Sequence, residues 1–202
     1  MNDNVRNPGH ENGTAQSDEQ LMLAFSRGST DAFKELFLRY KQPVFGFFRR
    51  RIADPAQAEE LTQETFLAII RACARYEPRA MFSTYIFAIS LRILRAYRRK
   101  AALRAALFGA EPRPERPNLR SDGQAELILR QAVGKLERID REVLLLREFE
   151  QLSYAQIAEL LALPLNTVRS RLFRARIALR DLLAPPVRQS TPAVVAEPEE
   201  CP

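Results

Sequence analysis

Histidine and cysteine are scarce in this chain of 202 residues, and their scarcity excludes several kinds of site. The one histidine, His10, lies in a polar stretch rich in Asn and Gly, which argues against Ser-His or Cys-His catalysis and against His-ligated metals. The two cysteines, Cys73 and Cys201, are too few for a disulfide framework or a Cys-rich zinc site. No apolar run approaches the roughly 18 residues of a membrane span, and the N-terminus does not resemble a signal peptide. We therefore expect a cytoplasmic protein that is not an enzyme, has no cofactor or metal and inserts no segment into a membrane.

The composition nevertheless suits a folded, basic protein. Lys and Arg total 31 against 25 Asp and Glu, which gives a formal charge of +6 and a pI near 9.7. Apolar residues make up 46% of the chain, enough to build a core, so wholesale disorder is excluded.

Helix signals dominate the chain, and strand signals are weak. Ser17 with Gln20 forms a capping-box pattern, Gly28 can end the helix that follows, and Asp54-Pro55 is a cap followed by Pro at the first helical position. Pro78 ends that later helix, and Ser83 can cap a fourth helix that runs to about Arg104. The pattern predicts an all-α fold.

A stretch rich in Pro and turn residues divides the helical chain into two small domains. Pro185-Pro186 stops the second domain. The predicted parts are a disordered leader (1–16), a first helical domain (17–104), a Pro-rich linker (105–123), a second helical domain (124–184) and a disordered tail (185–202).

The second domain contains the pattern of a DNA-binding helix-turn-helix. Ser153 and Gln156 make a capping box for a short helix, Ala162-Leu163-Pro164 forms a tight connection, and Asn166 or Thr167 begins a longer basic helix. Many such turns have Gly where Ala162 stands.

Projection of the longer helix at about 100° per residue separates a core face from a basic outer face. The core face consists of four apolar residues that project to the same side of the helix: Val168, Leu172, Ala175 and Leu179. The candidate DNA-binding residues on and beside the outer face are Thr167, Arg169, Ser170, Arg171, Phe173, Arg174 and Arg176. The alternative is that this basic face is simply solvated. The helix-turn-helix connection and the single sign of charge on the outer face argue against this alternative.

The end of the first domain combines basic residues with aromatic ones. Six basic residues and no acid occur between Arg92 and Arg104, shortly after four aromatics, Tyr76, Phe82, Tyr85 and Phe87. Cations that follow a phosphate backbone and rings that stack on bases favour binding of single-stranded or partly opened nucleic acid. The alternative is that the aromatic residues belong to the core.

The helix that begins at Pro55 is acidic in its first half, with Glu59, Glu60, Gln63 and Glu64. The helix dipole favours acid there for structural reasons alone. If the face is functional it should contact a protein, because acid does not assist DNA binding. No cluster of Asp and His completes a two-metal catalytic site around Glu59 and Glu60.

Together the two domains resemble the extracytoplasmic-function subfamily of bacterial RNA polymerase sigma factors. In the first domain the resemblance rests on Arg27-Gly28, Asp31-Ala32-Phe33 and the run from Ala58 to Phe66, AEELTQETF. In the second it rests on LSYAQIA at 152–158 and on NTVRSRLFRAR at 166–176. The two domains resemble sigma domain 2 and sigma domain 4, in that order and across a linker.

The resemblance implies promoter recognition and DNA opening without chemistry of the chain's own. It implies as partners core RNA polymerase (through its β′ clamp and β flap), promoter DNA and an anti-sigma factor. The residues that match the polymerase-binding motif are Glu60, Gln63, Glu64 and Phe66. The resemblance assigns the −10 element and single-stranded DNA to Tyr76, Arg79, Phe82, Tyr85, Arg92, Arg95, Arg98 and Arg99, and the −35 element to the helix 169–176.

Three positions depart from the family in the strand-opening segment, where Trp, Asn and Asp commonly stand in place of Tyr85, Arg92 and Ala96. Two other functions remain open. One is an autonomous helix-turn-helix regulator, which needs no polymerase to bind its operator. The other is an adaptor that binds only proteins, whose DNA binding would be weak and nearly independent of salt.

Overall fold

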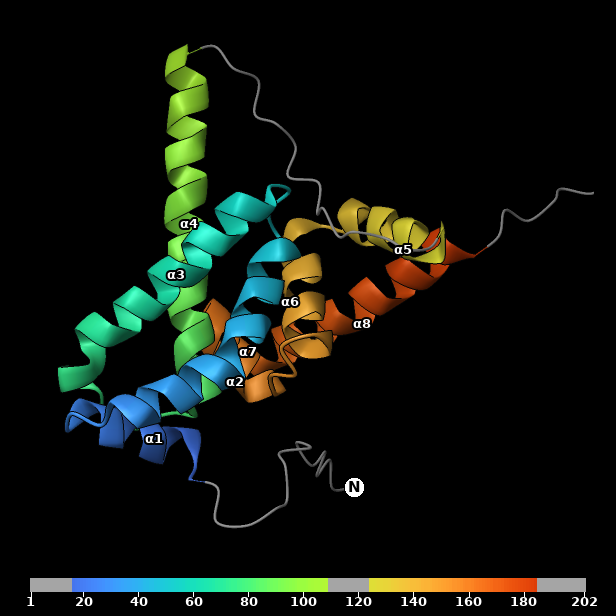
Figure 1. Ribbon diagram of the computed structural model, residues 1–202. Coiled ribbons are helices and arrows are strands. Elements are labelled where there is room, and N and C mark those ends of the chain that lie inside the picture. Colours follow the sequence, from blue (N-terminus) through green and yellow to red (C-terminus); the bar gives the residue numbers. More distant parts are fainter. Residues whose placement is uncertain (1–15, 109–123, 185–202) are drawn as a thin grey trace, which may run out of the picture.

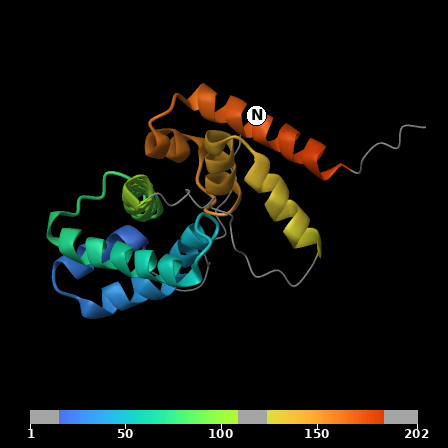
Figure 2. The same cartoon turned by 90° about the horizontal axis from the view of Figure 1, so that it is seen from above.

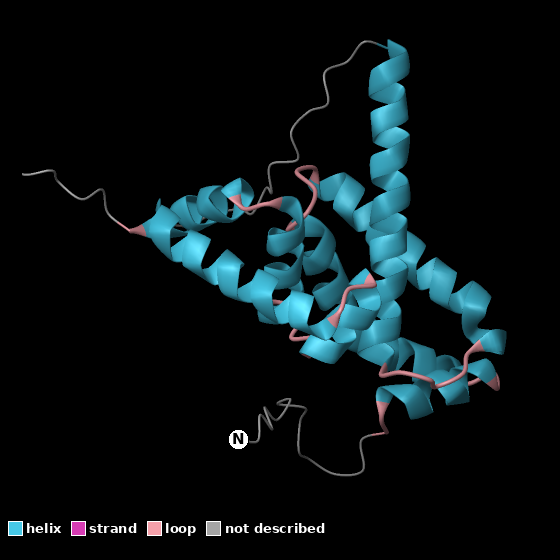
Figure 3. Ribbon diagram, turned by 180° about the vertical axis from the view of Figure 1, so that it is seen from behind, coloured by secondary structure: helices cyan, strands magenta, loops and turns pink. Residues whose placement is uncertain are grey.

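The computed structural model describes residues 16–108 and 124–184, which form eight α-helices and one short 3₁₀ turn. No strand occurs in these two ranges, as Figure 3 shows, so the all-α prediction is confirmed. The predicted leader up to residue 15, the predicted linker from residue 109 and the predicted tail lie outside the described residues.

The first helices, α1 (Asp18–Ser26), α2 (Thr30–Arg49) and α3 (Pro55–Ala72), begin at the caps that the sequence predicts or next to them. Ser17 accepts a hydrogen bond from the N–H of Gln20, whose side chain bonds back to Ser17, and Asp54 accepts from the N–H of Ala56. Gly28 has φ +100°, a left-handed conformation that ends α1 and that glycine adopts without strain.

A 3₁₀ turn at Cys73–Arg75 leads to α4 (Phe82–Phe108), which differs from the prediction at both ends. α4 begins at Phe82, not after Ser83, and the Phe82 N–H donates to Oε1 of Glu19 in α1 at 2.7 Å. At its other end α4 includes residues 105–108, which were predicted to be linker. Ala105, Ala106 and Leu107 favour helix, and Gly109 is the first residue that disfavours it.

The second domain consists of α5 (Gln124–Lys135), α6 (Arg138–Glu148), α7 (Tyr154–Leu161) and α8 (Leu165–Leu183). Its core is aliphatic, with Val143, Leu146, Ile157 and Val168 almost completely buried. The first domain instead has an aromatic core around Phe47, Phe48 and Phe82.

The two domains pack against each other. α4 contacts α2 and α3 in the first domain and α7 in the second, and Figure 1 shows that its C-terminal turns project away from the body. Seen from above in Figure 2, α1–α3 and α5–α8 lie on opposite sides, with α4 viewed end-on. The buried apolar residues of both domains form one continuous cluster.

Candidate DNA and polymerase surfaces

The helix-turn-helix of the second domain forms as the sequence predicts. The Ser153 side chain accepts from the Gln156 N–H, and the Gln156 side chain accepts from the Ser153 N–H. Ala162 adopts φ 54° and ψ 49°, the left-handed conformation that many such turns give to Gly. α8 begins at Leu165, directly after Pro164, one residue before the predicted start.

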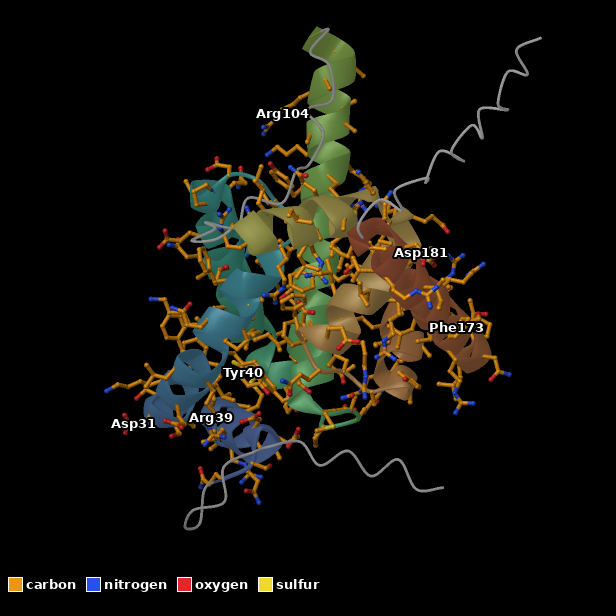
Figure 4. All side chains as sticks on the ribbon, turned by 90° about the vertical axis from the view of Figure 1, so that its right-hand side faces the viewer. Asp31, Arg39, Tyr40, Arg104, Phe173 and Asp181 are labelled. Carbon is orange, nitrogen blue, oxygen red and sulfur yellow. The ribbon has the colours of Figure 1, made fainter. Side chains whose placement is uncertain are left out.

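The core face of α8 is also as predicted. Val168, Leu172 and Ala175 are buried, and Leu179 is half-buried. On the outer face Phe173 is 67% exposed, and Figure 4 shows it on the side of α8 that faces away from the rest of the molecule. Ser170 is exposed as well, and Thr167 is half-buried. A ring at this exposure offers apolar area that a partner can cover.

The arginines of α8 divide into two groups. Arg171 donates to Oδ1 of Asp140 at 2.8 Å and lies 3.3 Å from a Glu137 carboxylate oxygen, and Arg176 donates to Glu148 at 2.7 Å. These hydrogen bonds raise the pKa of both guanidinium groups. Arg169 and Arg174 are exposed and make no ion pair within the described ranges, so they are the two whose charge is unopposed.

The acidic face of α3 is exposed at Glu60, Gln63 and Glu64, but Phe66 is not part of it. Phe66 is 5% exposed, with its ring centroid 4.8 Å from that of Phe37, edge to face. The assignment of Phe66 to a polymerase-binding surface is therefore corrected. Its position on α3 points to the aromatic core, where burial of the ring is favourable.

Two exposed apolar residues extend the acidic face, and sequence reasoning missed them. Leu67 is 48% exposed and Ile70 39% exposed. Leu67 follows Gln63 by one helical turn, and Ile70 comes three residues later, so both lie near the same side of α3. The signal was available in the sequence, as apolar residues that continue an otherwise polar stripe. Acid combined with exposed aliphatic groups is typical of a protein-binding surface.

Basic residues cover much of α4. Arg92, Arg95 and Arg99 are exposed, whereas Arg98 is half-buried against the second domain. Further along, Lys100 and Arg104 line a groove opposite Glu60 and Glu64 of α3. Figure 4 shows Arg104 on the projecting part of α4.

The aromatic residues before and within α4 form a packed cluster. Tyr76 and Phe82 are buried, at 8% and 1% exposure, whereas Tyr85 is half-buried. The ring centroids of Tyr76 and Tyr85 lie 5.2 Å apart, and those of Tyr40 and Phe82 lie 5.1 Å apart. Burial, with the nearby charge of Glu19, raises the pKa of Tyr76 to about 12.

This cluster corrects two predicted base contacts. In this arrangement Tyr76 and Phe82 cannot stack on a base, because core packing already covers their rings. Phe87, 3% exposed, is likewise core. Tyr85 is only half-buried, and Arg79 is exposed beside Glu77, to which it donates at 2.8 Å.

Two absences hold for the described ranges 16–108 and 124–184. No group of three or more His, Cys, Asp or Glu side chains could hold a metal ion there. No helix within them is both long and apolar enough to span a membrane.

Comparison with known proteins matches both domains. Residues 36–104 match the family described as "Sigma-70 region 2", and residues 126–179 match "Sigma-70, region 4". Among solved structures, that of CnrH in complex with the cytosolic domain of CnrY has a TM-score of 0.65 at 25% identity, covering 83% of this chain and 97% of that one. The sigma factor RpoE of Bartonella quintana, solved with the anti-sigma factor NepR, shares the fold at 20% identity with a TM-score of 0.64, covering 75% of this chain and 96% of that one.

Curated relatives match along most of their length. The RNA polymerase sigma-H factor of Pseudomonas aeruginosa is 32% identical over 193 residues, which cover 88% of this chain and 99% of the relative. The ECF sigma factor SigC of Mycobacterium tuberculosis is 32% identical over 176 residues, which cover 82% and 92%. Since the matches extend through both domains and agree with the helix-turn-helix, this chain belongs to the extracytoplasmic-function sigma factors of RNA polymerase.

Proposed function

We propose that three exposed surfaces divide the work of this promoter-recognising sigma factor: α3 binds core RNA polymerase, α4 binds the −10 element, and α8 binds the −35 element. Like other sigma factors it is a transcription initiation factor and not an enzyme. It acts on promoter DNA together with core polymerase, and we place it in the cytoplasm, where these partners are.

The observation that carries the proposal is the outer face of α8. Phe173 is 67% exposed between arginines, and the charges of Arg169 and Arg174 are free to contact DNA. An α-helix fits the major groove, where arginine bonds to guanine edges or phosphates and an apolar ring contacts the methyl group of thymine. Arg171 and Arg176 contribute less, because Asp140 and Glu148 already neutralise them.

The polymerase surface consists of Glu60, Gln63 and Glu64 together with Leu67 and Ile70. A helix that presents acid beside aliphatic groups suits a basic, partly apolar helical partner, for which we propose the β′ clamp. The apolar patch supplies affinity through burial, and the acid supplies orientation and association rate.

The β flap is the second contact that we propose with core polymerase, at the second domain. Leu127, Ile128 and Leu129 are three consecutive apolar residues of α5 that are each 40–46% exposed. Consecutive helical residues point about 100° apart, so these three expose apolar area around much of α5 that a partner can cover. We also propose that an anti-sigma factor binds this chain.

The −10 surface consists of Arg92, Arg95 and Arg99, with Tyr85 and Arg79 at its edge. The arginines follow the phosphate backbone, and the exposed part of the half-buried Tyr85 ring is available for stacking. Tyr76 and Phe82 anchor the two ends of the loop between α3 and α4, because their rings are buried in the core. Base extrusion costs a few kcal/mol, which the contacts of this loop and of Tyr85 with the extruded base must offset.

A substitution at Leu67 tests the polymerase surface. The change Leu67→Asp should abolish co-elution with core polymerase by size-exclusion chromatography. Leu38→Asp is the matched control, because Leu38 is also exposed (63%) but lies on α2. Equal co-elution of both variants would contradict the assignment of α3. The alternative of an autonomous regulator is not favoured. That alternative predicts that neither Leu67→Asp nor Leu38→Asp changes the affinity for an operator.

A further inference from the structure

We propose that Glu19 of α1 is a positioning residue for recognition of the −10 element. Its carboxylate holds the start of α4 and thereby fixes the loop 77–81, which receives the DNA base. Glu19 lies 63 residues before Phe82 in the chain, and no motif of the sequence points to it. This inference rests on the proposed function of α4 and of the loop that precedes it.

The first turn of α4 takes its cap from another helix. The first N–H groups of an α-helix have no acceptor within the helix, so a side chain just before the helix commonly supplies one. The residue before Phe82 is Met81, whose thioether is only a weak acceptor, and Ser83 lies inside α4. Oε1 of Glu19 accepts from the Phe82 N–H at 2.7 Å instead.

A carboxylate suits this place for two electrostatic reasons. A hydrogen bond to an ionised oxygen is stronger than one between neutral groups, and negative charge is favourable at the positive end of the helix dipole. Burial opposes the ionisation of Glu19, but hydrogen bonds from the Phe82 N–H, from its own N–H and from Ser17 outweigh burial and lower its pKa. Glu19 is therefore ionised at neutral pH, the form that binds the N–H most strongly.

The position of Glu19 is fixed through its neighbour Asp18. Asp18 accepts from Nη1 of Arg39 at 2.7 Å and from the hydroxyl of Tyr40 at 2.5 Å. Both donors belong to α2 and are labelled in Figure 4. Because α2 holds the start of α1 in this way, Glu19 gives the start of α4 a fixed point of attachment.

Glu19 also acts on the other end of the loop, at Tyr76. The ring centroids of Tyr76 and Phe82 lie 6.3 Å apart, edge to face, so the two ends of the loop meet over the aromatic core. α1 packs against the 3₁₀ turn that precedes Tyr76. The charge of Glu19 adds to the effect of burial in raising the pKa of Tyr76, which places this carboxylate near the phenol. One side chain of α1 therefore lies beside both ends of the loop.

Between its ends the loop is exposed and shaped by local bonds. Glu77, Pro78 and Arg79 are exposed. The Arg79 N–H donates to the Glu77 carbonyl at 2.8 Å, and Nε of Arg79 donates to the Glu77 carboxylate at 2.8 Å. These bonds join residues of the loop to each other and not to a helix. The place of the loop on the protein is therefore set by its ends, which Glu19 holds.

The same cap supports Tyr85. The Tyr85 N–H donates to the Met81 carbonyl at 3.1 Å, so the first turn of α4 links Tyr85 to the end of the loop. A loop and ring that are already ordered lose little conformational freedom when a base binds, and this preorganisation increases affinity. Loss of the Glu19 carboxylate should therefore weaken base capture and leave the surfaces of α3 and α8 unchanged.

Binding of the holoenzyme to a single strand of the −10 element, from a promoter found by run-off transcription, tests this role. Glu19→Ala should weaken strand binding about five- to thirtyfold and leave −35 duplex binding and co-elution with core polymerase unchanged. Glu19→Gln keeps an acceptor oxygen and should lose less. The matched control is Ser29→Ala, which removes the 3.3 Å bond from the Ala32 N–H that caps α2 in the same domain, and it should leave strand binding unchanged.

Three results of this assay would overturn the proposal. They are full strand binding by Glu19→Ala, equal losses in Glu19→Ala and Ser29→Ala, and a loss in Glu19→Gln as large as that in Glu19→Ala.

An abasic site separates positioning from a general loss of structure. Placed at each position of the −10 strand in turn, it removes at one position the base that the loop captures. On that strand the unaltered chain and Glu19→Ala should bind alike, because no base is left for the loop to hold. A ratio of the two affinities that is the same at every position would contradict a positioning role.

Amide hydrogen exchange in the free chain tests the cap without DNA. The Phe82 N–H should exchange at least about fivefold faster in Glu19→Ala than in the unaltered chain, and Ser29→Ala should not change its rate. An exchange rate that Glu19→Ala leaves unchanged would refute this inference alone. If the unaltered holoenzyme binds a scrambled strand as well as the −10 strand, it is the proposed function of α4 that fails.

Discussion

The division of the α8 arginines gives the sharpest quantitative prediction, which concerns Arg174→Ala. Arg174 is exposed and has no ion-pair partner in the described ranges, so truncation removes a charge that only DNA uses. If Arg174 bonds to a base edge, the loss is about 1–3 kcal/mol, or about 5- to 150-fold in affinity. If it contacts a phosphate instead, the slope of log K against log salt concentration falls by about 0.9.

Arg171→Ala is the matched comparison on the same helix. Arg171 donates to Asp140 at 2.8 Å, and the Asp140 side chain is 11% exposed. Truncation therefore leaves a nearly buried carboxylate without its donor, at a cost of about 1–3 kcal/mol in stability. We expect Arg171→Ala to lower the melting temperature more than Arg174→Ala does, and to weaken DNA binding less.

Fluorescence anisotropy with a labelled −35 duplex, over a series of salt concentrations, measures the DNA affinity of each variant and its salt dependence. Thermal denaturation measures the melting temperature of each variant. Equal losses of affinity in the two variants, with equal melting temperatures, would refute the division of these arginines into paired and free groups. A DNA affinity unchanged by Arg174→Ala would refute the assignment of α8 to DNA.

Three further substitutions test local features of the fold by urea denaturation. Ala162→Gly should stabilise the second domain by up to about 1 kcal/mol, because relief of the left-handed strain exceeds the entropy that Gly adds to the unfolded chain; a loss of stability would contradict the turn geometry. Asp54→Ala removes the 3.0 Å bond to the Ala56 N–H and should cost about 1 kcal/mol, with no change expected if the cap is not formed in solution. Ile157→Ala, at a side chain with 0% exposure, should cost about 2–5 kcal/mol, and a cost below about 1 kcal/mol would mean that Ile157 is not buried in the core of the second domain.

The features that the sequence predicted best are local ones. The capping boxes at Ser17 and Ser153 form as predicted, because each joins residues only three apart. The core face of α8 was predictable for the same reason, since helical periodicity alone places Val168 and Leu172 on one side.

The direction of the aromatic side chains was harder to predict. Phe66 and Tyr76 were assigned to binding surfaces and are buried, because helical spacing is equally compatible with a core and with an exposed stripe. Which one occurs depends on the neighbouring helices. Phe37 of α2 covers Phe66, and the pattern around Phe66 itself contains no sign of this.

The contact between the domains was beyond sequence reasoning altogether. Arg51 meets Glu142 and Glu150 across 91 and 99 residues, and nothing in the run of three arginines at 49–51 distinguishes a buried cation from a solvated one. Only the three-dimensional packing brings these charges together and takes them out of water.

Run-off transcription on a promoter library tests the central claim most directly, with purified core polymerase alone and with this protein added. We predict discrete new transcripts whose templates share two upstream elements separated by a constant spacing. Transcripts that disappear with Leu67→Asp and persist with Leu38→Asp would connect this activity to the exposed face of α3. The account would be contradicted if the protein produced no new transcripts and did not co-elute with core polymerase.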